Sequence, residues 1–188
     1  MSKTLSLRFL VSATSAAFLF GAFPAHAQLG NPADNAKATA NTKVSDADRE
    51  FFEDIAHANL AEIDTGKMAL EKGQSKNVKT FAQKMIDDHT KAQSGLEALA
   101  KRKGITLPTE TDMQHKGIAT TLSALSGNAF DEQYISHVGV GDHERTHSLL
   151  TKVSKNAKDP DLKAYAAKTV KAVDQHLAMA RKMQGKKQ

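Results

Sequence analysis

The stretch VKTFAQKMIDDHTKAQSGLEAL, residues 78–99, decides the fold class. Its apolar residues recur at steps of three and four, which is the period of one face of an α-helix. That face consists of Val78, Phe81, Ala82, Met85, Ala92, Leu96 and Leu99. His89 stands in the middle of the same face, where a core-facing helix usually carries an apolar side chain. The stretch therefore predicts an amphipathic helix in a packed core, and it raises the question of what a histidine does there.

Three more segments have the same helical period, together with start and stop signals. The four predicted long helices span residues 45–73, 75–104, 128–156 and 159–185. Ser45 and Asp48 form a variant of the capping box at the first start, Gly104 can end the second helix, and Pro160 can open the fourth. These signals predict an all-α four-helix bundle over residues 44–185.

The segment between the second and third long helices is unusually long. Residues 105–128 include a turn around Leu107-Pro108, and their pattern predicts a short helix over about 113–125. A connection of this length can return along the bundle, so that the second and third long helices run parallel, as in bundles with a crossover connection.

The N-terminal residues have the pattern of an export signal. Lys3 and Arg8 precede an apolar run over residues 9–23, and Ala25-His26-Ala27 is the small-x-small pattern after which signal peptidase cuts. Residues 28–43 are small and polar, which is typical of a flexible leader. We therefore expect a cleaved signal peptide over 1–27 and an exported protein, in the periplasm or associated with the outer membrane.

The composition excludes several classes of partner and site. The chain has no cysteine, so disulfides, thiolate metal ligands, a cysteine nucleophile and a lipid-bearing cysteine are all excluded. A net charge of +5 without any Trp does not indicate a nucleic-acid surface. No segment after the export signal approaches the roughly 18 consecutive apolar residues of a membrane span. The basic C-terminus, including the tail 186–188, has two interpretations. It could be attracted weakly to anionic lipid, or it could simply be a solvated helix end whose charges complement the helix dipole.

Each long helix directs one ionisable side chain toward the core. On 100° helical steps, Glu62 falls on the apolar arc of the first helix, His89 on that of the second and His176 on that of the fourth. In the third helix the arc centres on Asp142, but a one-residue π-bulge at the nearby glycines would turn His143 inward instead. Counting residues from the loops puts all four groups near the middle of the bundle.

Two functional interpretations of these groups compete. In the first, they form a hydrogen-bonded layer that fixes the register of a non-catalytic envelope protein. In the second, one Zn, Cu, Ni or Fe ion is bound for buffering, transport or stress response. The candidate ligands are Glu62, His89, His143 and His176, with Asp142 as the alternative to His143, Met85 and Met183 as possible neighbours, and Asp88 or Asp174 as an outer partner. An acid-base enzyme is a weaker third alternative, because the chain has no nucleophile motif.

Four short motifs resemble a known family. They are MIDDH at 85–89, FDEQY at 130–134, GDH at 141–143 and HLAMA at 176–180. In combination they resemble the exported bacterial domain-of-unknown-function family DUF4142, whose members are often labelled predicted outer membrane proteins, and the resemblance covers about residues 45–185. The family is grouped with the ferritin-like four-helix bundles, so the resemblance implies that fold.

The resemblance does not extend to the di-iron centre of ferritin-like enzymes. That centre needs a Glu-x-x-His pattern on two of the helices. Here Ile86 stands three residues before His89, and Val173 stands three residues before His176. We therefore do not expect a dinuclear oxidase site, and any cofactor would be a single transition-metal ion.

Overall fold

The computed structural model describes residues 44–185. The predicted signal peptide, leader and basic tail lie outside the described residues. The elements are α1 (Asp46–Lys72), α2 (Lys76–Arg102), α3 (Met113–Ser123), α4 (Gly127–Gln133), the π-helix η1 (Tyr134–Asp142), α5 (His143–Asn156) and α6 (Pro160–Gln184). The described residues form no strand, which confirms the predicted all-α class. None of their helices is long and apolar enough to cross a membrane.

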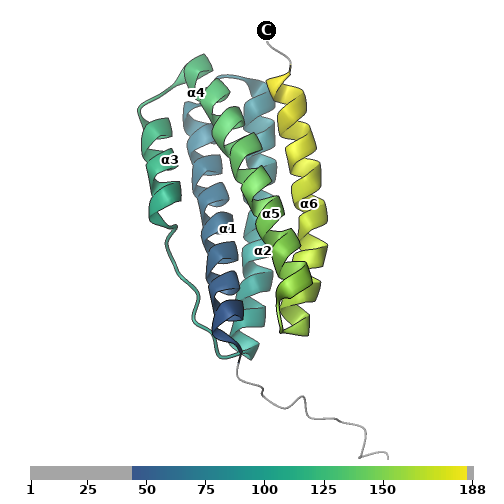
Figure 1. Ribbon diagram of the computed structural model, residues 1–188. Helices are drawn as coiled ribbons and strands as arrows, with labels where there is room; N and C mark the ends of the chain where they lie inside the picture. The colour runs from purple at the N-terminus through teal and green to yellow at the C-terminus, as the bar shows by residue number, and fades with distance from the viewer. Residues whose placement is uncertain (1–43, 186–188) are drawn as a thin grey trace, which may run out of the picture. The chain divides into compact units, whose positions relative to one another are not determined.

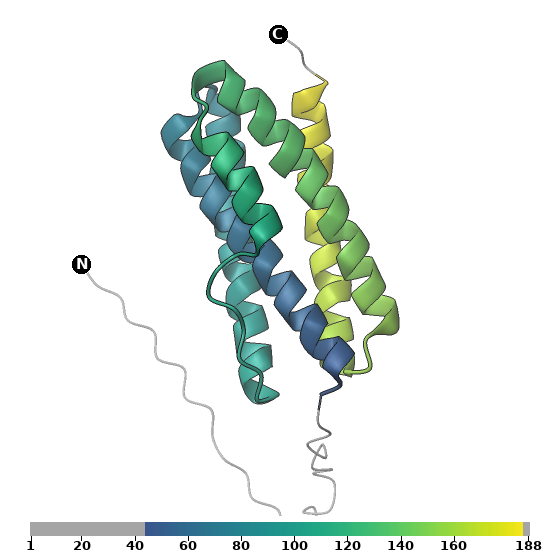
Figure 2. The ribbon, with the colours of Figure 1, turned by 60° about the vertical axis from the view of Figure 1, so that its left-hand side comes forward.

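The helices form a ferritin-like bundle of four long rods, one of which is built from α4, η1 and α5 in succession (Figure 1). A short turn joins α1 to the antiparallel α2, and a second short turn joins α5 to the antiparallel α6. After α2 the chain returns along the outside of the bundle, where α3 packs against α1 (Figure 2). As a result α2 runs parallel to the α4–η1–α5 rod, as the long connection allowed.

A buried carboxylate holds the turn between α1 and α2. Asp131 in α4 accepts hydrogen bonds from the backbone N–H groups of Gln74 (3.1 Å) and Ser75 (2.7 Å). These amides lie at the start of α2, where helical partners are missing. The bonds therefore tie the start of the third rod to the turn between the first two.

A second carboxylate does the same at the opposite end of the bundle. Asp48 accepts from the backbone N–H groups of Lys158 and Asp159, in the turn between α5 and α6. The sequence pattern suggested a capping box, and Ser45 does accept from the amide of Asp48. The Asp48 carboxylate, however, bonds to another turn. Lys103, just after α2, adds an ion pair to Asp159 at 2.7 Å.

The apolar core has two halves, separated by polar side chains. One half includes Phe52, Ile55, Leu96, Leu150 and Leu162, and the other includes Phe81, Met85, Phe130, Tyr134 and Val138. Each fully buried large apolar side chain contributes about 1.5–3 kcal/mol. Between the halves lie the buried residues that we call the polar layer: Asn59, Glu62, His89, His143 and His176.

Replacing Asp131 by alanine should destabilise the fold. The change leaves the amides of Gln74 and Ser75 without their carboxylate acceptor. We expect a loss of about 2 kcal/mol in the free energy of unfolding, measured by urea titration followed by circular dichroism. Glu132→Ala is the matched control, because the neighbouring Glu132 is exposed. Equal stability of the two variants would contradict this role of Asp131.

Candidate metal centre

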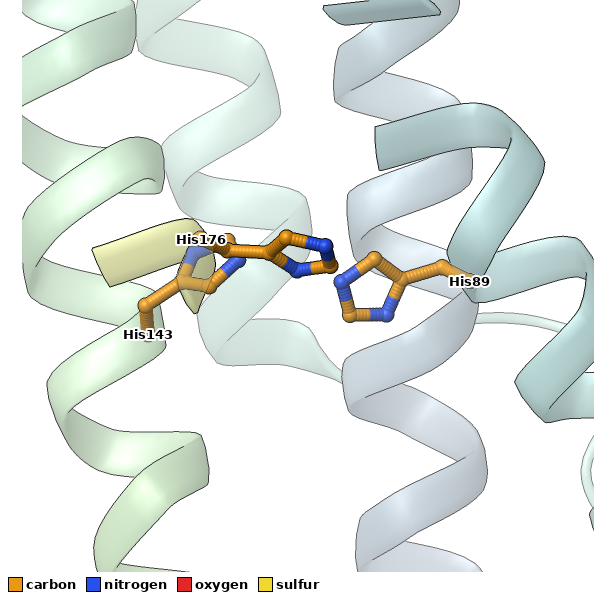
Figure 3. A group of neighbouring side chains, drawn as sticks. All are labelled: His89, His143 and His176. Carbon is orange, nitrogen blue, oxygen red and sulfur yellow. The ribbon is translucent and has the colours of Figure 1, made fainter. Parts of the chain in front are cut away.

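Three histidines from three rods meet at the centre of the polar layer. His89 comes from α2, His143 from the start of α5 and His176 from α6, as Figure 3 shows. Their ring centroids are 5.4–5.7 Å apart. One nitrogen of each ring lies within 4.8 Å of one nitrogen of each of the others. With exposures of 3%, 1% and 2%, these residues, which we call the histidine triad, are shielded from solvent.

The π-helix explains how His143 reaches the triad. The buried side of the first part of the rod runs through Tyr134 and Val138 to Asp142, whereas the buried side of α5 runs from Leu150 back to His143. The wider turn of η1 joins these two faces, so that both Asp142 and His143 are buried. Of the two alternatives left by the sequence, His143 is the one that lies in the triad.

Asp142 is buried on another side of the rod. Its carboxylate accepts a hydrogen bond from Arg145. The same carboxylate lies 4.0 Å from Nε2 of His115 at the start of α3. Asp142 therefore takes part in the contact with α3 and does not belong to the histidine cluster.

Each imidazole of the triad donates its outer N–H to a fixed acceptor. Nδ1 of His89 donates to Oδ1 of Asn59 at 3.1 Å, and Nε2 of His176 donates to Oδ2 of Asp88 at 2.7 Å. Nδ1 of His143 donates to the backbone carbonyl of Val138 at 3.0 Å. Because all three partners are oxygen acceptors, each proton is on the outer nitrogen and sets the tautomer of its ring.

The carbonyl group that accepts from the His143 ring belongs to η1 itself. At the junction with α5, the backbone N–H of His143 donates to Val140. The Val138 carbonyl, five residues before His143, receives the ring N–H instead. The π-helix thus positions His143 and also supplies its hydrogen-bond acceptor.

The inner nitrogens of the three rings face one another without any hydrogen-bond donor. His89 Nε2, His143 Nε2 and His176 Nδ1 are all buried and have no partner among the described residues. Burial lowers the pKa of His89 well below its usual value, and burial lowers the pKa of His143 to about 4. Burial also lowers the pKa of His176, against the opposing influence of Asp88. At pH 7 the triad is therefore neutral and presents three lone pairs to a common centre.

A chain of side-chain amides sets the orientation of Asn59. The exposed Glu97 can only accept, so Nε2 of Gln93 donates to it at 3.0 Å. The Gln93 oxygen then accepts from Nδ2 of Asn59 at 3.4 Å. This leaves Oδ1 of Asn59 for His89. A carboxylate at the surface therefore determines, through two amides, which nitrogen of His89 is protonated.

Glu62 lies beside the triad, and not among its inner nitrogens. Its Oε1 is 3.3 Å from Nδ1 of His143, the nitrogen that already donates to Val138, and neither carboxylate oxygen has a hydrogen bond. Burial raises the pKa of Glu62 well above its usual value, and the nearby Asp142 raises it further. The hydroxyl of Tyr134 is likewise buried without a partner, and its pKa is raised by burial and by Glu62.

The remaining residues singled out from the sequence have other surroundings. Met85 and Met183 belong to the apolar half of the core around Tyr134. Asp88, one of the two suggested outer partners, bonds to His176. The other, Asp174, has its Oδ1 3.2 Å from Nε2 of His147, which is more exposed than the triad.

Sequence reasoning missed Gln93, Tyr134 and the carbonyl of Val138 as parts of the site. Gln93 stands four residues after His89 on the same helical face, so its inward position could have been recognised. Tyr134 stood in the sequence only as part of a family motif. The Val138 carbonyl could not have been found, because the π-helix decides which backbone carbonyl the His143 ring faces.

Comparisons with known proteins support the fold and identify the family. The chain is similar to the crystal structure of a DUF305 fragment from Deinococcus radiodurans, with a TM-score of 0.67 and 15% identity over 76% of this chain and 97% of that one. It is also similar to CopM in the Cu(II)-bound form, with a TM-score of 0.62 and 15% identity over 73% of this chain and 95% of that one. No curated protein matches its sequence. The family described as Domain of unknown function (DUF4142) matches residues 33–183, and the chain belongs to this family.

Proposed function

We propose that the protein binds one transition-metal ion through His89 Nε2, His143 Nε2 and His176 Nδ1. The observation that carries this proposal is the meeting of three buried lone pairs with no hydrogen-bond donor between them. Imidazole nitrogens bond such ions at about 2.0–2.1 Å, so an ion at the centre would draw the three rings together. Three outer acceptors, at Asn59, Val138 and Asp88, would hold the rings in the required tautomers.

A purely hydrogen-bonded layer fits these contacts less well. Such a layer needs donors, and all three outer protons of the triad are already used. A water molecule has two protons and cannot donate to three acceptors. A proton shared between rings is disfavoured at neutral pH, because burial lowers the pKa values of His89 and His143. The register-fixing role of the layer therefore does not account for the arrangement of the inner nitrogens.

The ligand chemistry favours a divalent ion of the later transition metals. Neutral imidazoles suit Zn²⁺, Cu²⁺, Ni²⁺ and Fe²⁺, and the general affinity order places Cu²⁺ highest. CopM, which has a similar fold, is known in a Cu(II)-bound form, so Cu²⁺ is the first ion to test. The carboxyl group of Glu62 lies at the outer nitrogen of His143, which makes it a neighbouring group and not a fourth ligand.

Binding for buffering or transport suits the site better than catalysis. The triad is only 1–3% exposed, and it does not line either of two hollows found on the described part of the surface. A substrate would need such a cleft beside the ion.

We further propose that the protein is exported, on the strength of the signal pattern in residues 1–27.

Tag-free protein should bind one Cu²⁺ or Zn²⁺ per chain. His89→Ala, His143→Ala and His176→Ala should each weaken binding at least about a hundredfold, since even the loss of an outer partner costs ten- to a hundredfold. Calorimetric titration against a competing chelator measures the affinities. At a hundred times the Kd, the ion should stabilise the wild type by about 2.7 kcal/mol.

The matched control is His147→Ala, which removes a histidine from the same rod outside the triad. This variant should bind the ion as the wild type does. The proposal fails if no ion binds at micromolar concentrations, or if the triad variants keep the affinity of His147→Ala.

The stability of the metal-free Glu62→Gln variant tests whether the polar layer exists to stabilise the fold or, as in a binding site, lowers its stability. The folded-state pKa of Glu62 is raised, so folding above the usual carboxyl pKa requires proton uptake or a buried charge. The contribution of Glu62 to stability is therefore most favourable at low pH and is lost as the pH rises. Because the glutamine carries no charge to bury, Glu62→Gln should be more stable than the wild type at pH 8.

The advantage of Glu62→Gln should shrink toward pH 4, and urea titrations at both pH values measure it. Glu71→Gln on the same helix is the control, because Glu71 is exposed. If the layer existed to stabilise the fold, Glu62→Gln would instead be less stable than wild type at pH 8.

Export predicts processing at a defined bond. When the full chain is expressed in a Gram-negative bacterium, the periplasmic fraction should contain a protein whose mass corresponds to a start at Gln28. A variant with Ala25→Asp and Ala27→Asp should retain residues 1–27, because signal peptidase requires small residues there. Recovery of an unprocessed wild-type chain in the cytoplasm would refute export.

A further inference from the structure

The triad is buried, so an ion needs a route to it, and the outer contacts of the three rings differ in this respect. His89 bonds to Asn59, which is 2% exposed, and His143 bonds to Val138, which is 0% exposed. The side chain of Asp88, which bonds to His176, is 36% exposed. Among the three rings, only His176 is therefore joined directly to a group in contact with solvent.

Asp88 also lines a shallow hollow on the surface of α2. The hollow lies along the first half of α2, and its lining includes Gln83, Lys84, Asp87 and Asp88. Inside it, the ammonium group of Lys84 lies 2.8 Å from Oδ2 of Asp88. This is the same oxygen that accepts the N–H of His176 across the seam between α2 and α6. One carboxylate oxygen thus connects a surface cation with a ligand of the buried triad.

We propose that Asp88 is the access point for the metal ion, with Lys84 as the cation that occupies this point before the ion arrives. This inference rests on the proposed metal-binding function. A divalent ion binds first to the Asp88 carboxylate and displaces the Lys84 ammonium. The hydrogen bond from His176 then opens, and the ring turns about its side-chain bonds so that Nδ1 takes the ion. When the ring returns, the ion lies between His89 and His143, and Nε2–H again donates to Asp88.

The chemistry of the contacts suits this exchange. A carboxylate oxygen that accepts from an ammonium group and an imidazole N–H is a site adapted to positive charge. The Lys84–Asp88 pair is partly exposed, with side-chain exposures of 45% and 36%, so breaking it costs little. The other two rings offer no equivalent, because their direct acceptors are neutral and buried.

The test measures rates as well as affinities. Stopped-flow mixing of metal-free protein with Cu²⁺ or Zn²⁺ gives the association rate constant, and transfer to a strong chelator gives the dissociation rate constant. Asp88→Asn should lower the association rate constant by about tenfold or more, within the range known for electrostatic steering into clefts. Lys84→Met should raise it, since the competing cation is gone.

Asp87→Asn is the matched control. Asp87 lines the same hollow and carries the same charge, but it accepts from Gln83 and has no bond to the triad. Its loss should change the association rate constant by less than about twofold. Thermal unfolding of the metal-free variants is the check that each surface change leaves the fold intact.

The outcomes separate the two proposals. If wild-type protein binds no ion, the metal-binding function fails and the access route fails with it. If the wild type binds but Asp88→Asn changes only dissociation, Asp88 merely orients His176 and the access route is wrong. The route is equally wrong if Asp87→Asn slows association as much as Asp88→Asn, because general surface charge would then explain the effect.

Discussion

The hydrogen bonds from the outer nitrogens of three buried imidazoles are the interactions on which the site depends. Each bond places the proton on the outer side of its ring and leaves the inner nitrogen as an acceptor. The acceptors are of three kinds: the side-chain amide of Asn59, the backbone carbonyl of Val138 in the π-helix, and the carboxylate of Asp88 at the seam between α2 and α6. Because they are independent of one another, the three rings are held from three different directions.

These bonds explain how a small bundle tolerates a polar layer through its core. Burying neutral imidazoles costs less than burying charged ones, and burial itself keeps the triad neutral by lowering the pKa values of His89 and His143. For Glu62, burial raises the pKa and so favours the neutral carboxyl group, which is less costly to bury than a carboxylate. The two apolar halves on either side provide the packing, and the turns are tied by Asp131 and Asp48. Burying the polar side chains of the site therefore costs free energy, which the apolar packing of the two core halves offsets.

Much of this arrangement was predictable from the sequence because it follows from local rules. Helical period and capping residues predicted four long helices, and the left-handed backbone at Gly104 ends the second as expected (φ 66°). Residue counts from the turns placed Glu62, His89 and His176 near one height, and all three are buried in the polar layer. The long connection allowed parallel second and third rods. These inferences needed only the repeat of the α-helix and the length of the chain.

The sequence by itself determined the helices, their order and which helical faces are buried, because the spacing of apolar residues is a property of the chain. Only the tertiary structure decided between Asp142 and His143, since a single π-helical turn rotates all residues that follow it. It also decided that Glu62 lies outside the ring of lone pairs and that Asp88 bonds to His176 while Asp174 does not. Such choices depend on distances of a few ångströms between different helices. Helix packing sets those distances, and no periodicity within one helix encodes them.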